Sequence, residues 1–309
     1  MPWKNKSSFA SMTPTLQIKR LSRSYGSIRA LDDFSLRVDP GSVYGILGPN
    51  GSGKTTTLSI ILDVLRADSG SYEWFGQWPS AGVRRRIGSM LDRPNFLPYL
   101  SAVKNLQISA EVKGAGHSQI NEVLEIVNLS SRKYSSFHTY SLGMKQRLAL
   151  ASTLLGDPDV LVLDEPTNGL DPQGIFDVRS IIQKVADQGK TIVLASHILD
   201  EIEKVCTHVA ILKNGKKLTS GTTREILTQN DTLEIAASDF DKLQQSLKDI
   251  KGISDIARQE DIIIASIDDD VDIAELNAAL ISKGIKPHHL VRKKQTLESH
   301  FMEVTRGSQ

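Results

Sequence analysis

The chain has 309 residues, 39% of them hydrophobic and 24% charged, which is the composition of a folded globular protein long enough for two domains. Its 37 basic and 36 acidic residues leave a net charge of +1, so there is no electrostatic case for a nucleic-acid partner. The single cysteine, Cys206, excludes an internal disulfide and suits a reducing compartment. No apolar run reaches the roughly 20 residues that span a bilayer.

The beginning of the chain predicts an extension followed by short strands. Residues 1–14 are polar and mixed, and we expect a flexible N-terminal extension there. Between Leu16 and Val38 the apolar residues alternate in short runs, which predicts strands of an antiparallel subdomain. Tyr25 lies among them and is either a packed strand residue or a ring that stacks on a nucleotide base. Its place ahead of a glycine-rich segment favours stacking.

That glycine-rich segment, Gly48 to Thr55, fits G-x-x-x-x-G-K-[ST], the phosphate-binding loop of NTPases. Glycines let the backbone curl and bring its N–H groups to the phosphates. Lys54 adds a charge that reaches the β- and γ-phosphates, and the Thr55 hydroxyl is placed to ligate Mg²⁺. A predicted strand at 42–47 precedes the loop and a predicted helix follows it. The expected nucleotide-binding residues are Gly48, Pro49, Asn50, Gly51, Ser52, Gly53, Lys54, Thr55 and Thr56.

The middle of the chain predicts two strands, a helical insertion and a capped helix. Strands are expected over 71–75 and 87–91, and the second ends at Asp92. From Pro94 to Tyr140 the apolar spacing is helical, which predicts an insertion between the strands of an NTPase core. Ser141 is a suitable N-cap for a helix expected at 145–155.

Two later strands deliver charged side chains at their carboxyl ends. The apolar run at 160–163 predicts a strand buried on both faces, and it ends in Asp164 and Glu165. A second buried strand, at 191–195, leads to His197. Asp164 can hold Mg²⁺, Glu165 can orient or deprotonate a water, and His197 can reach a γ-phosphate. The alternatives are an ordinary acidic strand end and a structural histidine, and the phosphate loop favours the functional interpretation.

The remaining segments close one domain and build another. A helix at 199–206 and two strands joined by Asn214-Gly215, a typical hairpin turn, complete a first domain that we place at residues 15–230. From residue 231 to 309 the predicted order is strand, helix, strand, strand, helix, strand, followed by a terminal helix. This order predicts a small α+β domain of ferredoxin-like type.

These motifs, in this order, resemble the ATP-binding subunit of an ABC transporter over roughly Leu16 to Asn230. The resemblance implies an α/β P-loop ATPase domain with a parallel core sheet, an antiparallel β subdomain and a helical subdomain. It also assigns a role to each motif. Tyr25 becomes the base-stacking aromatic, Gly48–Thr55 the Walker A loop, Asp164 the Walker B aspartate, Glu165 the catalytic glutamate, Asp171 the D-loop aspartate and His197 the switch histidine.

The chain departs from the family pattern at two places. Asp92 stands where the family has the Q-loop glutamine, and its oxygen remains a possible ligand for Mg²⁺ or water. In the signature segment Leu142 and Met144 replace a glycine and a glutamine, while Ser141 and Gly143 are kept for the γ-phosphate. The run Ser-Leu-Gly-Met-Lys-Gln-Arg-Leu is similar to the bacitracin-resistance branch of bacterial ABC exporters.

The resemblance implies an ATPase that uses ATP and Mg²⁺ and drives a separate integral-membrane permease. It implies a head-to-tail dimer with a second copy and a place at the cytoplasmic face of the membrane. A peptide antibiotic, a drug or a lipid-like molecule is the expected cargo. Phe96 and Tyr99, in the helical insertion, are the expected docking surface for the permease. The alternatives are a non-transport ABC ATPase acting on ribosomes or nucleic acid, and a regulatory subunit that binds ATP without hydrolysing it.

Overall fold

The computed structural model describes residues 13–91, 95–227, 231–268, 270–293 and 296–306. Asp92 and most of the expected N-terminal extension lie outside these residues. The chain divides into two compact units, Met1–Ser220 and Gly221–Gln309. The domain boundary expected from the sequence, after residue 230, stays a prediction.

The first unit is built around a six-stranded sheet in the order β5-β6-β7-β3-β8-β9. Neighbouring strands from β5 to β8 run parallel. Every residue of β3, β6 and β7 is buried, as expected for strands covered on both faces. The strands are β3 (Val43–Leu47), β5 (Ile87–Met90), β6 (Val160–Asp164), β7 (Thr191–Ser196), β8 (His208–Lys213) and β9 (Lys216–Thr222).

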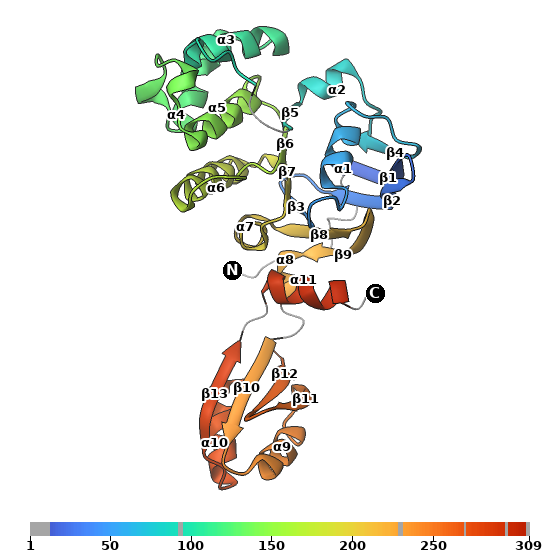
Figure 1. The fold of residues 1–309 in the computed structure, drawn as a ribbon, viewed down its shortest axis with the longest axis vertical. Coiled ribbons are helices and arrows are strands. Elements are labelled where there is room, and N and C mark those ends of the chain that lie inside the picture. The colour runs from blue at the N-terminus through green and yellow to red at the C-terminus, as the bar shows by residue number, and fades with distance from the viewer. Residues whose placement is uncertain (1–12, 92–94, 228–230, 269, 294–295, 307–309) are drawn as a thin grey trace, which may run out of the picture. The chain divides into compact units, whose positions relative to one another are not determined.

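A three-stranded antiparallel sheet forms the second layer of this unit. Its order is β2-β1-β4, with β1 (Leu16–Tyr25), β2 (Ile28–Val38) and β4 (Ser69–Trp74). Helix α1 (Lys54–Ile61) packs against β2 as well as β6 and β7, so its apolar side chains share one core with both sheets. A short helix that the sequence pattern missed, α2 (Ala81–Arg85), follows β4 and begins at the N-cap Ser80 (Figure 1).

The predicted helical insertion is present, and it lies apart from the antiparallel sheet, at the other end of the unit (Figure 1). It contains α3 (Ala102–Lys113), α4 (Ile120–Ile126) and the 3₁₀ segments His117–Gln119, Ser130–Arg132 and Phe137–Thr139. Helix α5 (Leu142–Leu154) returns to the core sheet and packs on β5. It begins at Leu142 rather than Lys145, because the Ser141 hydroxyl accepts a hydrogen bond from the Met144 N–H.

Two further helices follow the strands that carry the acidic residues. Helix α6 (Pro172–Asp187) comes after β6, with Asp171 as its N-cap and Pro172 at the first position. Helix α7 (Leu199–Val205) comes after β7 and packs closely on β3. A Cβ at Gly45 would lie only 2.9 Å from Cys206 Sγ, so glycine is required for this approach.

The second unit contains a four-stranded antiparallel sheet in the order β11-β12-β10-β13. This is the strand order of the predicted ferredoxin-like arrangement, with two helices between the strands. Within the described residues, no helix is both long and apolar enough to cross a membrane. The elements are α8 (Thr223–Leu227), β10 (Asp231–Ala237), α9 (Phe240–Lys248), β11 (Ile253–Gln259), β12 (Ile262–Ile267), α10 (Ile273–Ser282), β13 (Pro287–Lys293) and α11 (Leu297–Arg306).

Candidate nucleotide-binding site

The segment Gly48–Thr55 forms a tight loop between β3 and α1. A Cβ at Gly48 would meet the Leu212 carbonyl oxygen at 2.4 Å, so the loop fits the end of β8 only without a side chain there. Gly53 has a φ of 107° and a Cβ there would meet the Ala30 carbonyl oxygen at 2.4 Å. The Gly215 N–H donates to the Ser52 carbonyl, which fixes the loop to the β8–β9 turn. These contacts create a curled backbone ahead of a helix N-terminus, the geometry that receives phosphate.

Lys54, Glu165 and His197 meet beside this loop. The buried Lys54 ammonium donates to the Gly48 carbonyl at 2.8 Å and lies 3.3 Å from Glu165 Oε1. Glu165 Oε2 is 2.7 Å from His197 Nδ1. Three residues that are distant in the sequence therefore form one chain of charged and polar contacts.

The ends of β6 and β7 create this meeting point. The two strands are parallel neighbours, so the residues after each one emerge at the same edge of the sheet. Glu165 turns sharply, with a φ of 46°, and its N–H donates to the Ala195 carbonyl of β7. Asp164, one residue earlier, remains buried at 6% exposure. The sharp turn separates a buried carboxylate from one that faces the phosphate loop.

Tyr25 lies at the end of β1 with 48% of its surface exposed. The Arg23 guanidinium lies 5.2 Å from the centre of its ring. Arg23 is itself held by Asp68 at 2.6 Å. The exposed ring is available to stack on a base, and stacking on a nucleotide remains a prediction for this residue.

Ser141, Gly143 and Asp171 line a separate hollow. It lies where the first turns of α5 and α6 come together, and Arg147 and Asp177 also line it. Asp171 caps α6 by accepting from the Gly174 N–H at 2.9 Å. The lining residues come from these helices and the loop before α6 rather than from the phosphate loop. Within one copy, the signature segment therefore occupies a surface of its own.

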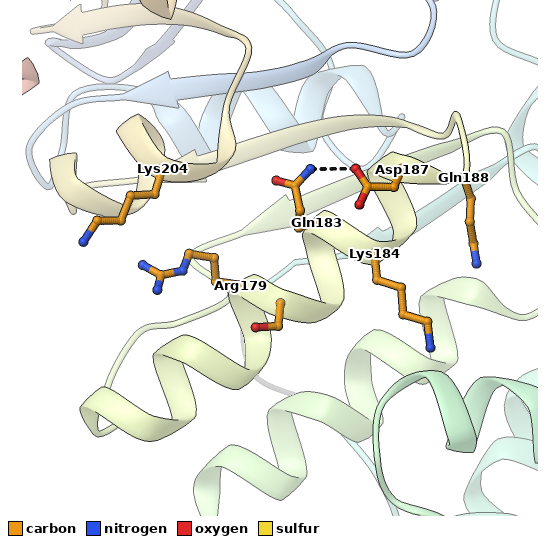
Figure 2. A pocket seen from close by; sticks show the side chains of 7 residues that line it. Arg179, Gln183, Lys184, Asp187, Gln188 and Lys204 are labelled. Carbon is orange, nitrogen blue, oxygen red and sulfur yellow. Dashed lines mark hydrogen bonds between the residues drawn. The ribbon is translucent and has the colours of Figure 1, made fainter.

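A second hollow, along α6 and beside Lys204 of α7, is less suited to a nucleotide. Figure 2 shows its side chains fanning outward rather than converging on one point. The Gln183 amide donates a hydrogen bond to the Asp187 carboxylate. The Lys204 ammonium of α7 lies 2.7 Å from the Asp200 carboxylate. No glycine-rich loop lines it, and its lysines, Lys184 and Lys204, are exposed, whereas Lys54 is buried.

The sequence interpretation missed two residues next to the site. Thr167 and Glu201 are 3% and 4% exposed, and the Thr167 hydroxyl donates to Glu201 Oε2. Burial raises the pKa of the Glu201 carboxyl above its ordinary value, and the neighbouring Glu165 acts in the same direction. One signal in the sequence could have identified Glu201. It is an acidic residue four positions before Val205, on a helix face that otherwise carries apolar side chains.

The parallel sheet and the loop Gly48–Thr55 define a P-loop nucleotide-binding ATPase. The ABC transporter family model matches residues 31–168. The bacitracin transport ATP-binding protein BcrA of Bacillus licheniformis is 36% identical, with 96% of this chain and 99% of that protein covered. The lantibiotic transport ATP-binding protein SrtF of Streptococcus pyogenes is 38% identical over 65% of this chain and 88% of its own length.

A solved structure agrees with these relatives. The structure of an ATP-binding subunit of an ABC transporter matches with a TM-score of 0.62 and 28% identity, covering 70% of this chain and 92% of that one. The chain belongs to the ABC transporter family, as an ATP-binding subunit. It binds ATP and hydrolyses it, and the fold class expected from the sequence is confirmed.

Proposed function

We propose that this subunit powers the export of an amphiphilic peptide antibiotic through a separate membrane permease. The observation that carries the catalytic part is the convergence of Lys54, Glu165 and His197 beside the phosphate loop. The cargo is proposed from relatives named for bacitracin and lantibiotic transport. Drugs and lipid-like molecules are alternative cargoes of similar character.

The residue roles follow from the chemistry of phosphoryl transfer, which depends on positioning and charge stabilisation. Lys54 and the loop N–H groups hold the β- and γ-phosphates. Glu165 orients the attacking water and takes up its proton, and His197 binds the γ-phosphate. For this to happen, Lys54 and His197 exchange their present contacts with Glu165 for contacts with the nucleotide.

Mg²⁺ fits the same place. Thr55 is exposed in the first turn of α1, and Asp164 ends the neighbouring strand β6. Among the described residues, no three His, Cys, Asp or Glu side chains gather into a metal site. A Mg²⁺ ion held by Thr55, Asp164 and the phosphates matches this composition, because Mg²⁺ prefers few protein ligands plus phosphate. Asp92, outside the described residues, is proposed as a further oxygen ligand, direct or through water.

A second copy completes the site in this proposal. The hollow with Ser141, Gly143 and Asp171 has exposed helix N-terminal groups but lies away from the phosphate loop of its own chain. In a head-to-tail dimer these groups receive the γ-phosphate bound by the partner copy. Size measurement in MgATP tests this: the Glu165→Gln variant is expected to be a stable dimer, and Ser141→Arg in that background is expected to return it to a monomer. A monomer in both variants contradicts the dimer.

The permease is proposed to dock on the helical insertion and to hold the subunit at the inner face of the membrane. Tyr99 is 70% exposed there, whereas Phe96 packs edge-on against Phe137 with 5.3 Å between ring centres. Tyr99 is therefore the better probe. We expect Tyr99→Ala to lower permease-stimulated ATP hydrolysis and to leave basal hydrolysis unchanged. Trp78→Ala, at 64% exposure and outside the insertion, is the matched control and should change neither rate.

The cargo is tested with the subunit and its permease together in lipid vesicles. A bacitracin-type peptide is expected to stimulate ATP hydrolysis and to accumulate on the side away from the ATPase. Stimulation by ribosomes, with no effect of peptide or permease, would support the ribosome-acting alternative. Retained ATP binding with no hydrolysis in any mixture would support a regulatory subunit.

A further inference from the structure

The loops after β6 and β7 are joined at two levels. The more exposed contact is the Glu165–His197 pair beside the phosphate loop, with 19% and 36% of the two side chains exposed. The second contact is the Thr167–Glu201 hydrogen bond, whose two side chains are almost fully buried. Each contact links the same two segments, so the loops are held together even if one contact opens.

The buried Glu201 carboxyl lowers the stability of the fold, and packing does not explain why an acid occupies this position. Its Oε2 accepts from Thr167, but its Oε1 is buried without a hydrogen-bond partner among the described residues. A buried carboxyl group with an unsatisfied oxygen destabilises a fold relative to an apolar side chain of similar volume. Ile202 and Val205 on the same helix show that the surroundings accept apolar groups. A positional role accounts for the acid better than packing does.

The loop that Thr167 anchors carries both catalytic and interface groups. The Asn168 N–H donates to the Glu165 carbonyl, and the Leu170 N–H donates to the Thr167 carbonyl. Thr167 therefore lies at the centre of a hydrogen-bonded turn that begins at Glu165 and ends just before Asp171. Glu201 lies in the first turns of α7, close after His197.

We propose that Thr167 and Glu201 form a buried strap that keeps Glu165 and His197 in register while nucleotide displaces their direct contact. Both are then positioning residues for ATP hydrolysis rather than catalytic residues. Because both side chains are buried and hydrogen-bonded to each other, neither is free to bind phosphate or Mg²⁺. The strap rests on the roles proposed above for Glu165 and His197.

The test compares ATP hydrolysis and thermal stability in substituted forms of the full chain. Thr167→Val and Glu201→Met each remove the hydrogen bond with little change in volume. Each is expected to lower kcat about tenfold with KM for ATP changed less than about twofold, because small misplacement of reacting groups affects turnover more than binding. Glu201→Met is also expected to keep or raise the melting temperature, which a purely structural role would not combine with slower turnover.

Three further variants sharpen the result. Thr167→Ser and Glu201→Gln keep the donor and the acceptor, and both are expected to retain most of the activity. Thr153→Val is the matched control, since this buried threonine of α5 also donates from its hydroxyl, to the Leu150 carbonyl, away from the site. The Thr167→Val/Glu201→Met double variant is expected to be no slower than either single variant.

The outcomes separate failure of the strap from failure of the proposed roles. If Thr167→Val behaves like Thr153→Val, or if the two single losses multiply in the double variant, the strap is wrong. If Glu165→Gln itself keeps full turnover, the proposed catalytic role is wrong. A measurement without hydrolysis supports the same decision: Thr167→Val should speed amide hydrogen exchange in both 165–171 and 197–201, and an effect on the first segment alone overturns the strap.

Discussion

Both units of this chain combine helices with a β-sheet, yet their charged residues are placed differently. In the first unit, Asp164 and Glu201 are buried at or just beyond the carboxyl ends of parallel strands, next to a loop built for phosphate. In the second unit, the buried Asp231 is paired with Arg292 at 2.8 Å, and Glu234 is paired with Lys293 at 2.6 Å. These ion pairs of the second unit link the neighbouring strands β10 and β13. The buried carboxylates of the first unit lie instead where the parallel strands end.

The largest effect is expected from Gly48→Ala. The added Cβ would lie 2.4 Å from the Leu212 carbonyl oxygen and 2.5 Å from Ser52 Oγ, so the phosphate loop must move. We expect the affinity for ATP to fall about 100-fold, or about 3 kcal/mol, because loop N–H groups that hydrogen-bond to the charged phosphates are displaced. A fluorescent ATP analogue measures it. Gly82→Ala, which meets only Ser80 Oγ at 3.9 Å, should bind like the unmodified protein.

The next effect is on stability and is confined to the second unit. Leu280 is completely buried in the core of that unit, and Leu280→Ala should lower its stability by about 2–5 kcal/mol. ATP affinity is expected to stay the same, because the nucleotide site belongs to the other unit. Hydrogen exchange by peptide, with and without ATP, checks both statements. Loss of ATP binding in this variant would contradict the separation of roles.

Cys206 tests the packing of α7 on β3. The thiol is 6% exposed, and burial raises its pKa above the ordinary value. At pH 8 we expect almost no reaction with a thiol reagent in the native protein, and one equivalent after unfolding in urea. Gly45→Ala should increase the native rate, since its Cβ would lie 2.9 Å from Cys206 Sγ. An equally fast reaction in native and unfolded protein would contradict the packing.

The smallest effect concerns the pH dependence of the second unit. The hydrogen bond from Lys293 lowers the pKa of the Glu234 carboxyl below its ordinary value. A carboxyl whose pKa is lowered by folding stabilises the folded state at pH values above its ordinary pKa. This stabilisation is lost as the pH falls through the lowered pKa. Glu234→Gln should therefore cost less than about 1 kcal/mol near neutral pH, and the difference should vanish in acid.

The difference is measured by urea unfolding between pH 3 and pH 7, with hydrogen exchange of the β10 amides as the probe of the second unit. Glu260→Gln, an exposed residue outside any strand, is the control and should show no such trend. A Glu234→Gln difference that grows in acid would reverse the assigned sign.

Much of the fold could be predicted because the periodicity and the turn residues agree. Buried apolar runs gave the parallel strands, and Asn214-Gly215, with φ values of 50° and 79°, forms the predicted hairpin turn. Helix α2 was missed because its five residues are too few to show a 3.6-residue period.

The site could be predicted in part. Motifs identified Lys54, Glu165 and His197, and the structure brings them together. Thr167 and Glu201 were missed because a buried hydrogen bond between distant positions leaves no local pattern. Phe96 was grouped with Tyr99 from sequence proximity, and only packing separates the half-buried ring from the exposed one.

The most direct measurement is the ATP hydrolysis rate of the purified subunit and its Glu165→Gln variant, with Glu122→Gln as an exposed control. The proposed roles predict a fall of about 100-fold or more in kcat for Glu165→Gln, with ATP still bound and a rate for Glu122→Gln equal to that of the unmodified protein. Full hydrolysis by Glu165→Gln would contradict the claim that Lys54, Glu165 and His197 form the hydrolytic centre.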